Sequence, residues 1–134
     1  MSEKNVEVVR RWWGGFNDDG MPPLALCDDE IQIWMPPDFP VRGVFEGHDG
    51  VRRWRDQVFD VFDNPRVDAE EIVDVHGDGT TVLMLLRATG TASYTEMKID
   101  YEWGAVWALR DGKLLHAQGY LNRAEALEAA GLSE

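Results

Sequence analysis

Residues 97–121 form two strand-like runs joined by a short polar turn, and this pattern constrains the fold more than any other part of the chain. Asp111-Gly112 is a strong hairpin signal, because glycine readily adopts the positive φ that tight turns require. Alternate residues of the first run share a face, with Tyr101, Trp103, Ala105 and Trp107 on one side and Asp100, Glu102, Gly104 and Val106 on the other. The hairpin predicts a sheet with a broad apolar face and a second face that borders a small cavity.

The length and charge of the chain limit its class. A chain of 134 residues fits one domain, spanning residues 1–134. Its net charge of −12 argues against nucleic-acid and anionic-membrane partners, because phosphates would be repelled. Cys27 is the only cysteine, so an intrachain disulfide is impossible and a cytoplasmic location is expected. The longest purely apolar run, residues 82–86, is too short to cross a bilayer.

Hydrophobic periodicity predicts an α+β fold. Helices are expected over residues 3–17, from Asp49 to the residues before Pro65, and over 122–132, where Asn122 and Glu125 have capping-box spacing. Strands are expected at 31–35, 67–75, 81–89, 97–109 and 113–121, with a bulge near residues 70–72. This order favours an α+β fold, in which helices pack on the concave face of a curved, mostly antiparallel sheet. The first and the long second helix would close a cavity there.

Three segments resemble one known family. They read WWGGFNDDG at residues 12–20, EGHDGVRRW at 46–54 and VWALRDGKLLHAQGYLNRAEALEAAGL at 106–132. They are similar to the SnoaL-like branch of the nuclear transport factor 2-like superfamily, whose fold is that of the ketosteroid isomerases. The resemblance implies the cone-shaped half-barrel and a homodimer built through the convex side of the sheet. Because the superfamily includes isomerases, cyclases, dehydratases and epoxide hydrolases, the resemblance does not assign a reaction.

The catalytic residues of the isomerases are not retained. Their tyrosine aligns with Trp12, their general-base aspartate with Met35 and their second acid with Gly104. Met35 cannot accept a proton, and Gly104 cannot donate a hydrogen bond to an oxyanion. Arg87 is followed by Ala88-Thr89, so the arrangement of an arginine between two carboxylates that epoxide hydrolases need is also missing. Isomerase chemistry of the known type is therefore not expected.

Glu102 is the candidate catalytic residue, because the expected cavity face of its strand carries it two residues from Gly104. In an apolar cavity its pKa would rise and it could act as a general acid or base; alternatively, it is a salt-bridged carboxylate at the rim. Arg55 could pair with Glu102 or hold an anionic ligand group, or lie on a solvated helix face. The remaining pocket candidates are aromatic or apolar residues that could equally be plain core: Trp12, Trp34, Met35, Phe39 and Trp54, together with Gly104.

Two functions remain open from the sequence. The first is a pocket for a mostly apolar small molecule, with acid–base chemistry or simple binding. The second is a non-catalytic dimeric interaction domain with a vestigial cavity. Neither a metal nor a cofactor is expected, since the three histidines share no ligand spacing. The homodimer is expected to use Leu85, Trp103 and Trp107 on the convex face, because they would offer more apolar area than a soluble monomer exposes.

Overall fold

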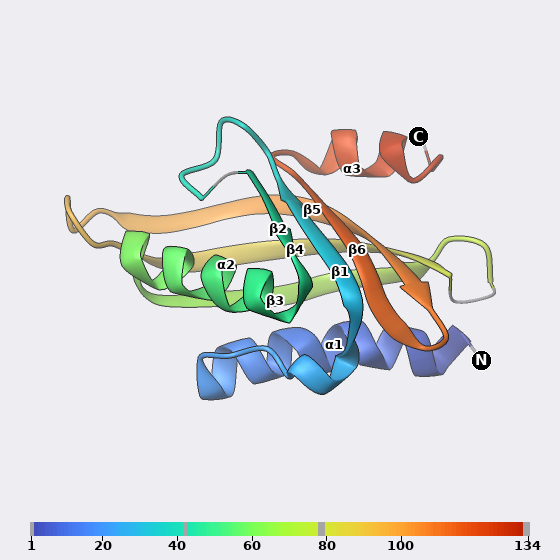
Figure 1. Ribbon diagram of the computed structural model, residues 1–134. Coiled ribbons are helices and arrows are strands. Elements are labelled where there is room, and N and C mark those ends of the chain that lie inside the picture. The colour runs from blue at the N-terminus through green and yellow to red at the C-terminus, as the bar shows by residue number, and fades with distance from the viewer. Residues whose placement is uncertain (1, 42, 78–79, 133–134) are drawn as a thin grey trace.

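The computed structural model describes residues 2–41, 43–77 and 80–132, and in these residues a six-stranded sheet carries three α-helices (Figure 1). The elements, in chain order, are α1 (Ser2–Asp19), the 3-10 turn η1 (Leu24–Leu26), β1 (Cys27–Met35), β2 (Gly43–Glu46), α2 (Gly47–Val61), β3 (Phe62–Asp74), β4 (Thr81–Ala92), β5 (Lys98–Arg110), β6 (Lys113–Tyr120) and α3 (Arg123–Ala129). This is the predicted α+β half-barrel.

The sheet has the strand order β2-β1-β6-β5-β4-β3 and is antiparallel except where β1 runs parallel to β6. The predicted hairpin of β5 and β6 is present, and both turn residues, Asp111 and Gly112, have positive φ, at 52° and 75°. The predicted bulge is also present, since the register of β3 against β4 shifts between Ala69 and Glu71. The hairpin therefore places β5 near the centre of the sheet.

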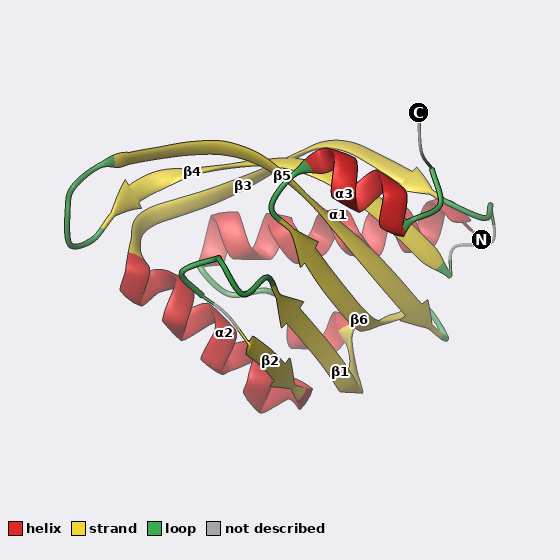
Figure 2. Ribbon diagram, turned by 90° about the horizontal axis from the view of Figure 1, so that it is seen from above, coloured by secondary structure: helices red, strands yellow, loops and turns green. Residues whose placement is uncertain are grey.

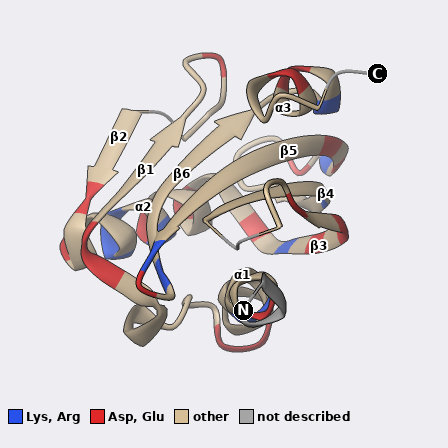
Figure 3. Ribbon diagram, turned by 90° about the vertical axis from the view of Figure 1, so that its right-hand side faces the viewer, with Lys and Arg blue, Asp and Glu red and all other residues tan. Residues whose placement is uncertain are grey.

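The helices lie on both faces of the sheet. Figures 2 and 3 show α1 and α2 on the concave side and α3 on the opposite, convex side. Asn17 fixes the end of α1 to β3, because its side-chain amide donates to the Val67 carbonyl at 2.7 Å and its oxygen accepts from the Val67 N–H at 2.9 Å. Gly15 allows Pro23, the residue before η1, to pack closely against α1. A Cβ at position 15 would lie only 2.6 Å from Cδ of Pro23.

Three predicted boundaries were wrong. The strand β2 was not predicted; it pairs with β1 and leads directly into α2. Helix α2 begins at Gly47, with Glu46 rather than Asp49 at the N-cap position. Strand β3 begins at Phe62, so Asn64-Pro65 lies within a strand at a register shift, where the missing N–H of proline is tolerated.

The largest correction concerns the two faces of β5. Trp103 and Trp107 point into the concave core with α1 and α2, whereas Gly104 faces α3 on the convex side. Leu85 also lies under α3 and packs with Ala126. The prediction that Leu85, Trp103 and Trp107 form an exposed dimer surface was therefore wrong. The apolar strand segment 82–86 is covered on both sides within a single chain.

Gly104 is predicted to be required for the docking of α3. A Cβ at this position would lie 2.5 Å from Cβ of Ala126, so one of the two backbones must move. We expect Gly104→Ala to lower the free energy of unfolding by about 1–3 kcal/mol, as overpacking usually does. Ala126→Gly should restore part of this loss in the double variant, measured by urea unfolding as a double-mutant cycle. Purely additive effects would contradict the contact.

Candidate functional site

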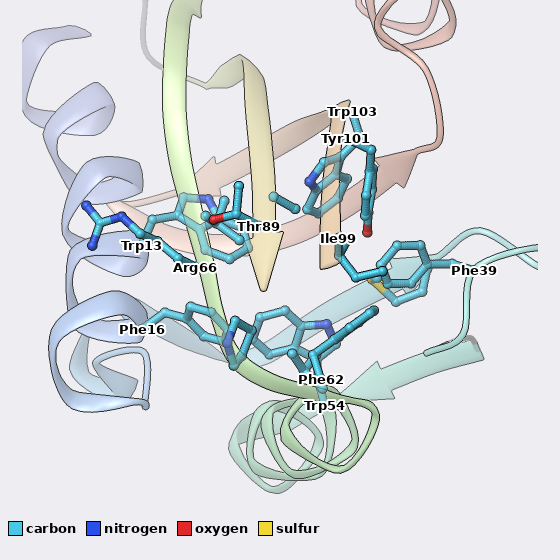
Figure 4. Close-up of a pocket in the computed structure, with 15 residues that line it drawn as sticks. Trp13, Phe16, Phe39, Trp54, Phe62, Arg66, Thr89, Ile99, Tyr101 and Trp103 are labelled. Carbon is cyan, nitrogen blue, oxygen red and sulfur yellow. The ribbon is translucent and has the colours of Figure 1, made fainter. Parts of the chain in front are cut away.

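An aromatic pocket opens between the concave face of the sheet and the helices α1 and α2 (Figure 4). About 440 Å³ inside it is free of protein atoms, part of it open to solvent. We call this the outer pocket, and its lining residues are Trp13, Phe16, Met35, Phe39, Trp54, Val58, Phe62, Pro65, Arg66, Val67, Ala88, Thr89, Ile99, Tyr101 and Trp103. The lining is mostly apolar, which suits a ligand that is itself mostly apolar.

A second, smaller pocket of about 290 Å³ adjoins the outer one and shares Trp13, Met35, Trp54 and Trp103 with it. We call this the inner pocket. Its full lining is Trp12, Trp13, Ile33, Met35, Trp54, Trp103, Ala105, Trp107, Ala117 and Gly119. Because α1, α2 and β5 each contribute tryptophans, the inner pocket exists only when all three elements are docked.

Local structure explains how the pocket residues are positioned. The two tryptophans Trp12 and Trp13 belong to the apolar stripe of α1, and Trp54 belongs to that of α2. Phe39 lies in the proline-rich segment after β1, where its N–H donates to the Pro36 carbonyl at 3.1 Å in a tight turn. Its ring stacks on Trp103 with centroids 6.1 Å apart. The segment therefore carries Phe39 to the wall of the outer pocket.

The surface of the outer pocket is almost entirely apolar, and Tyr101 carries its phenol on the concave face of β5. Arg66 on β3 pairs with Thr89 on β4, and both alternate with the concave-facing Val67 and Ala88, so their polar groups are on the convex side of the strands. The guanidinium of Arg66 is half-exposed and donates from Nε to Asp68 at 3.0 Å. Burial raises the pKa of the Tyr101 phenol above its ordinary value, so the hydroxyl stays protonated at neutral pH. The lining therefore favours apolar contacts with a ligand, with the Tyr101 phenol as the nearest hydrogen-bond donor on this face of the sheet.

Glu102 lies on the convex side and not in the cavity. Its side chain is 49% exposed and forms ion pairs with Arg87 at 3.2 Å and Arg123 at 3.4 Å. Arg87 also pairs with Asp100 and Glu70, and Arg123 with Glu70, so these five residues join β3, β4, β5 and α3. The placement of Glu102 in an apolar cavity was wrong, and so was its pairing with Arg55. The alternative interpretation, a salt-bridged carboxylate, describes its position.

The other predicted site residues divide into two groups. Met35, Phe39 and Trp54 line the outer pocket, and Trp12 lines the inner one. Arg55 instead donates from Nε to the Gly20 carbonyl at 2.6 Å, beyond the end of α1, and stacks over Phe59. Trp34 and Gly104 lie on the convex side of the sheet, where Trp34 is 40% exposed and near His116. These three positions are outside both pockets.

Sequence reasoning did not identify Tyr101 and Trp103 as pocket residues, and one signal could have found them. The side of β5 that carries Tyr101, Trp103 and Trp107 is much more apolar than the side that carries Glu102. The more apolar side of a strand normally faces the core of its own domain. Residues of a strand alternate between its two faces. Assigning the cavity to the wrong face of β5 therefore placed every residue of this strand on the wrong side of the sheet.

Sequence comparison identifies the family. Residues 9–117 match the SnoaL-like domain family, and the chain therefore belongs to it. No curated protein matches the chain in sequence.

Solved structures show the same fold at low sequence identity. TerC, crystallised with polyporic acid, is 19% identical with a TM-score of 0.75, and the match covers 96% of this chain and 98% of TerC. A putative SnoaL-like polyketide cyclase from Jannaschia sp. is 16% identical with a TM-score of 0.73, over 100% and 95% of the two chains. A ketosteroid isomerase-like protein from Catenulispora acidiphila, in complex with trimethylamine, is 13% identical with a TM-score of 0.74, over 94% and 93%.

Two features are absent from the described residues. Among them, no three His, Cys, Asp or Glu side chains converge in a way that could hold a metal ion. None of the described helices combines the length and apolar character needed to cross a bilayer.

Tyr101 is predicted to limit stability at high pH. The pKa of the Tyr101 phenol is higher in the folded chain than in the unfolded one. Below the unfolded pKa of about 10 the free energy of unfolding is therefore unaffected by this group, and above it the unfolded chain loses the phenol proton more readily, so the free energy of unfolding falls. We expect Tyr101→Phe to shift the midpoint of alkaline unfolding to higher pH, measured by circular dichroism. Tyr94→Phe, at an 81% exposed position, is the control and should leave the midpoint unchanged. Identical midpoints for wild type and Tyr101→Phe would rule out this role.

Proposed function

We propose that this protein binds a flat, mostly apolar small molecule in the outer pocket, and that it acts as a binding protein rather than through carboxylate acid–base chemistry. The observation that carries the proposal is the lining of the pocket. Among its described residues, the ionisable side chains are Arg66 and Tyr101, and the rest are overwhelmingly aromatic or aliphatic. A phenol with a raised pKa is a hydrogen-bond donor at neutral pH, whereas the guanidinium of Arg66 is already paired with Asp68.

The similar structures support a small molecule as the occupant. TerC was crystallised with polyporic acid, and the Catenulispora acidiphila protein is in complex with trimethylamine. Both share the cone fold with this chain, which supports the concave side as the place where a small molecule would bind. The aromatic walls formed by Phe39, Phe62 and Trp103 favour a flat ligand, because stacked rings gain dispersion and offset-stacking contacts.

The proposal predicts that filling the outer pocket abolishes binding. N-phenyl-1-naphthylamine, a neutral aromatic fluorophore, should bind saturably to the wild type with a blue-shifted emission. Ala88→Phe places a ring in the pocket, and we expect it to weaken binding by at least about tenfold, or ~1.4 kcal/mol. Ala108→Phe, on the convex side opposite His116, is the matched control and should bind as the wild type does. Unchanged binding by Ala88→Phe would refute the proposed site.

We also propose a homodimer, through a surface different from the one that the sequence suggested. Trp34 and Val44 pair across β1 and β2 and are each 40% exposed, and the ring of Trp34 lies 6.0 Å from that of His116 on β6. Trp34 and Val44 form an exposed apolar patch on the convex side, which is the side that the family resemblance implies for a dimer.

Sedimentation velocity tests this proposal. The wild type should sediment at micromolar concentration with twice the mass of the chain, because burying the patch against its symmetric copy removes apolar area from water. Trp34→Lys should give the monomer, since a charge would be buried at the interface. Tyr94→Lys changes an exposed aromatic residue elsewhere and should remain dimeric. A monomeric wild type would eliminate the dimer.

A further inference from the structure

Arg123, the first residue of α3, fastens this helix to three strands of the sheet. Its guanidinium pairs with Glu70 on β3 and, at 3.4 Å, with Glu102 on β5, and it donates to the Leu86 carbonyl on β4 at 3.2 Å. A cation is unfavourable at the N-terminus of a helix, so the stability of the helix itself does not explain Arg123. Its contacts hold α3 against the sheet, and we call these three contacts the clasp.

The bulge in β3 provides two of the acceptors of the clasp. The register of β3 against β4 shifts around Glu70, which is the extra residue of the bulge. A bulge disrupts the ladder locally and changes the direction of a side chain. Here the Glu70 carboxylate and the Leu86 carbonyl on the neighbouring strand both accept from Arg123. The irregularity of the sheet therefore coincides with the place where α3 is attached.

The surface beneath α3 is an apolar cluster separate from the concave core (Figure 3). Its buried members are Leu83, Leu85 and Ala126, whereas the tryptophans that line the pockets belong to the larger core on the other side of the sheet. Undocking of α3 would therefore leave the pocket walls and the concave core in place.

Three features make the docking of α3 weak. The helix has seven residues, which are too few for a helix to be stable in water without tertiary contacts. The ion pairs of the clasp are partly exposed, at 27% for Arg123, 40% for Glu70 and 49% for Glu102, and such pairs stabilise little. Nε of Arg123 is buried without a hydrogen-bond partner among the described residues, which is unfavourable in the docked state.

One row of side chains crosses the whole convex face, and α3 covers half of it. Each strand contributes one residue, directly opposite its neighbours in the register. From β2 to β3, the row is Val44, Trp34, Gln118, Val106, Leu83 and Val73. The first two are each 40% exposed, whereas the last three pack in the cluster beneath α3. The row contains no charged residue.

A second copy of the chain is the partner that this row fits. Each chain has a net charge of −12, so two copies repel each other, and a row without charged side chains lets them approach with the least repulsion. The exposed end of the row, Trp34 and Val44, is the patch that we propose as the dimer surface. Uncovering Val106 and Leu83 would extend that patch along the same row.

We propose that α3 is a releasable cover of the convex face, held closed by the Arg123 clasp and the small cluster beneath it, and that its release exposes Val106 and Leu83 to a second copy of the chain and enlarges the dimer interface. This inference rests on the proposed homodimer, because it adds the regulation of the same surface.

Hydrogen exchange measured by NMR tests whether α3 opens by itself. The amides of Ala126 and Ala130, which donate within α3, should exchange at least about tenfold faster than the paired amides of β5. Arg123→Ala should accelerate exchange in α3 by about a further tenfold, because three contacts are lost together, and should leave β5 unchanged. Arg110→Ala removes an arginine that pairs with two carboxylates of β1, and as the control it should not accelerate α3.

Sedimentation over a dilution series tests whether opening promotes association. A dimer that requires the open form is weakened by the fraction of chains that are closed. A tenfold increase in opening should therefore lower the dissociation constant of the dimer by about tenfold or more. Arg123→Ala should show this decrease, and Arg110→Ala should not.

Glu70→Gln and Asp100→Asn form a second matched pair, which keeps the test available if Arg123→Ala does not fold. Each removes one carboxylate charge from the same group of ion pairs. Glu70 contacts Arg123, whereas Asp100 pairs with Arg87. Glu70→Gln should accelerate exchange in α3 and tighten the dimer, and Asp100→Asn should do neither.

The failures of this inference and of the proposed homodimer are distinguishable. Exchange of α3 at the rate of β5 in both the wild type and Arg123→Ala would show that the helix does not open by itself, which overturns the cover. An unchanged dissociation constant overturns the cover and leaves the dimer intact. Assembly beyond the dimer would show that the uncovered surface has no defined partner, which also overturns it. If the wild type and Arg123→Ala are both monomeric, the cover and the dimer fall together.

Discussion

The packing of five tryptophans between the two concave-side helices and the sheet is the interaction on which the rest of the structure depends. Trp13 is at its centre, with ring centroids within 6.5 Å of Trp12, Trp54, Trp103 and Trp107. Truncating one such buried ring typically costs about 3–5 kcal/mol, a large part of the stability of a small domain. All five rings line the inner pocket, and Trp13, Trp54 and Trp103 also line the outer one, so the core and the candidate site share these side chains.

Using core residues as pocket walls has a physical consequence. Interlocked rings form a rigid wall, but their indole N–H groups cannot all find partners in an apolar interior. An unpaired buried donor costs about 1–3 kcal/mol, and five of them in one place are a substantial local penalty.

The convex side of the sheet is organised by a different interaction. The carboxylates of Glu70, Asp100 and Glu102 alternate with the guanidinium groups of Arg87 and Arg123 across β3, β4, β5 and α3. Exposed ion pairs of this kind contribute little individually, so apolar contacts of Leu83 and Leu85 with Ala126 hold α3 on the sheet. Since α3 already covers this part of the convex face, a partner chain would have to use the region of β1, β2 and β6.

The sequence by itself determined the fold class, the β5–β6 hairpin, the cap of α3 at Asn122 and the register shift near Ala69. These features depend on hydrophobic periodicity and on the chemistry of a few neighbouring residues. Only the tertiary structure decided which face of β5 is the concave one. Alternation fixes that Trp103 and Glu102 lie on opposite faces, but their assignment to cavity or exterior depends on where α1 and α3 dock. The unpaired indole N–H groups were equally invisible in the sequence, because hydrogen-bond satisfaction depends on contacts between residues far apart along the chain.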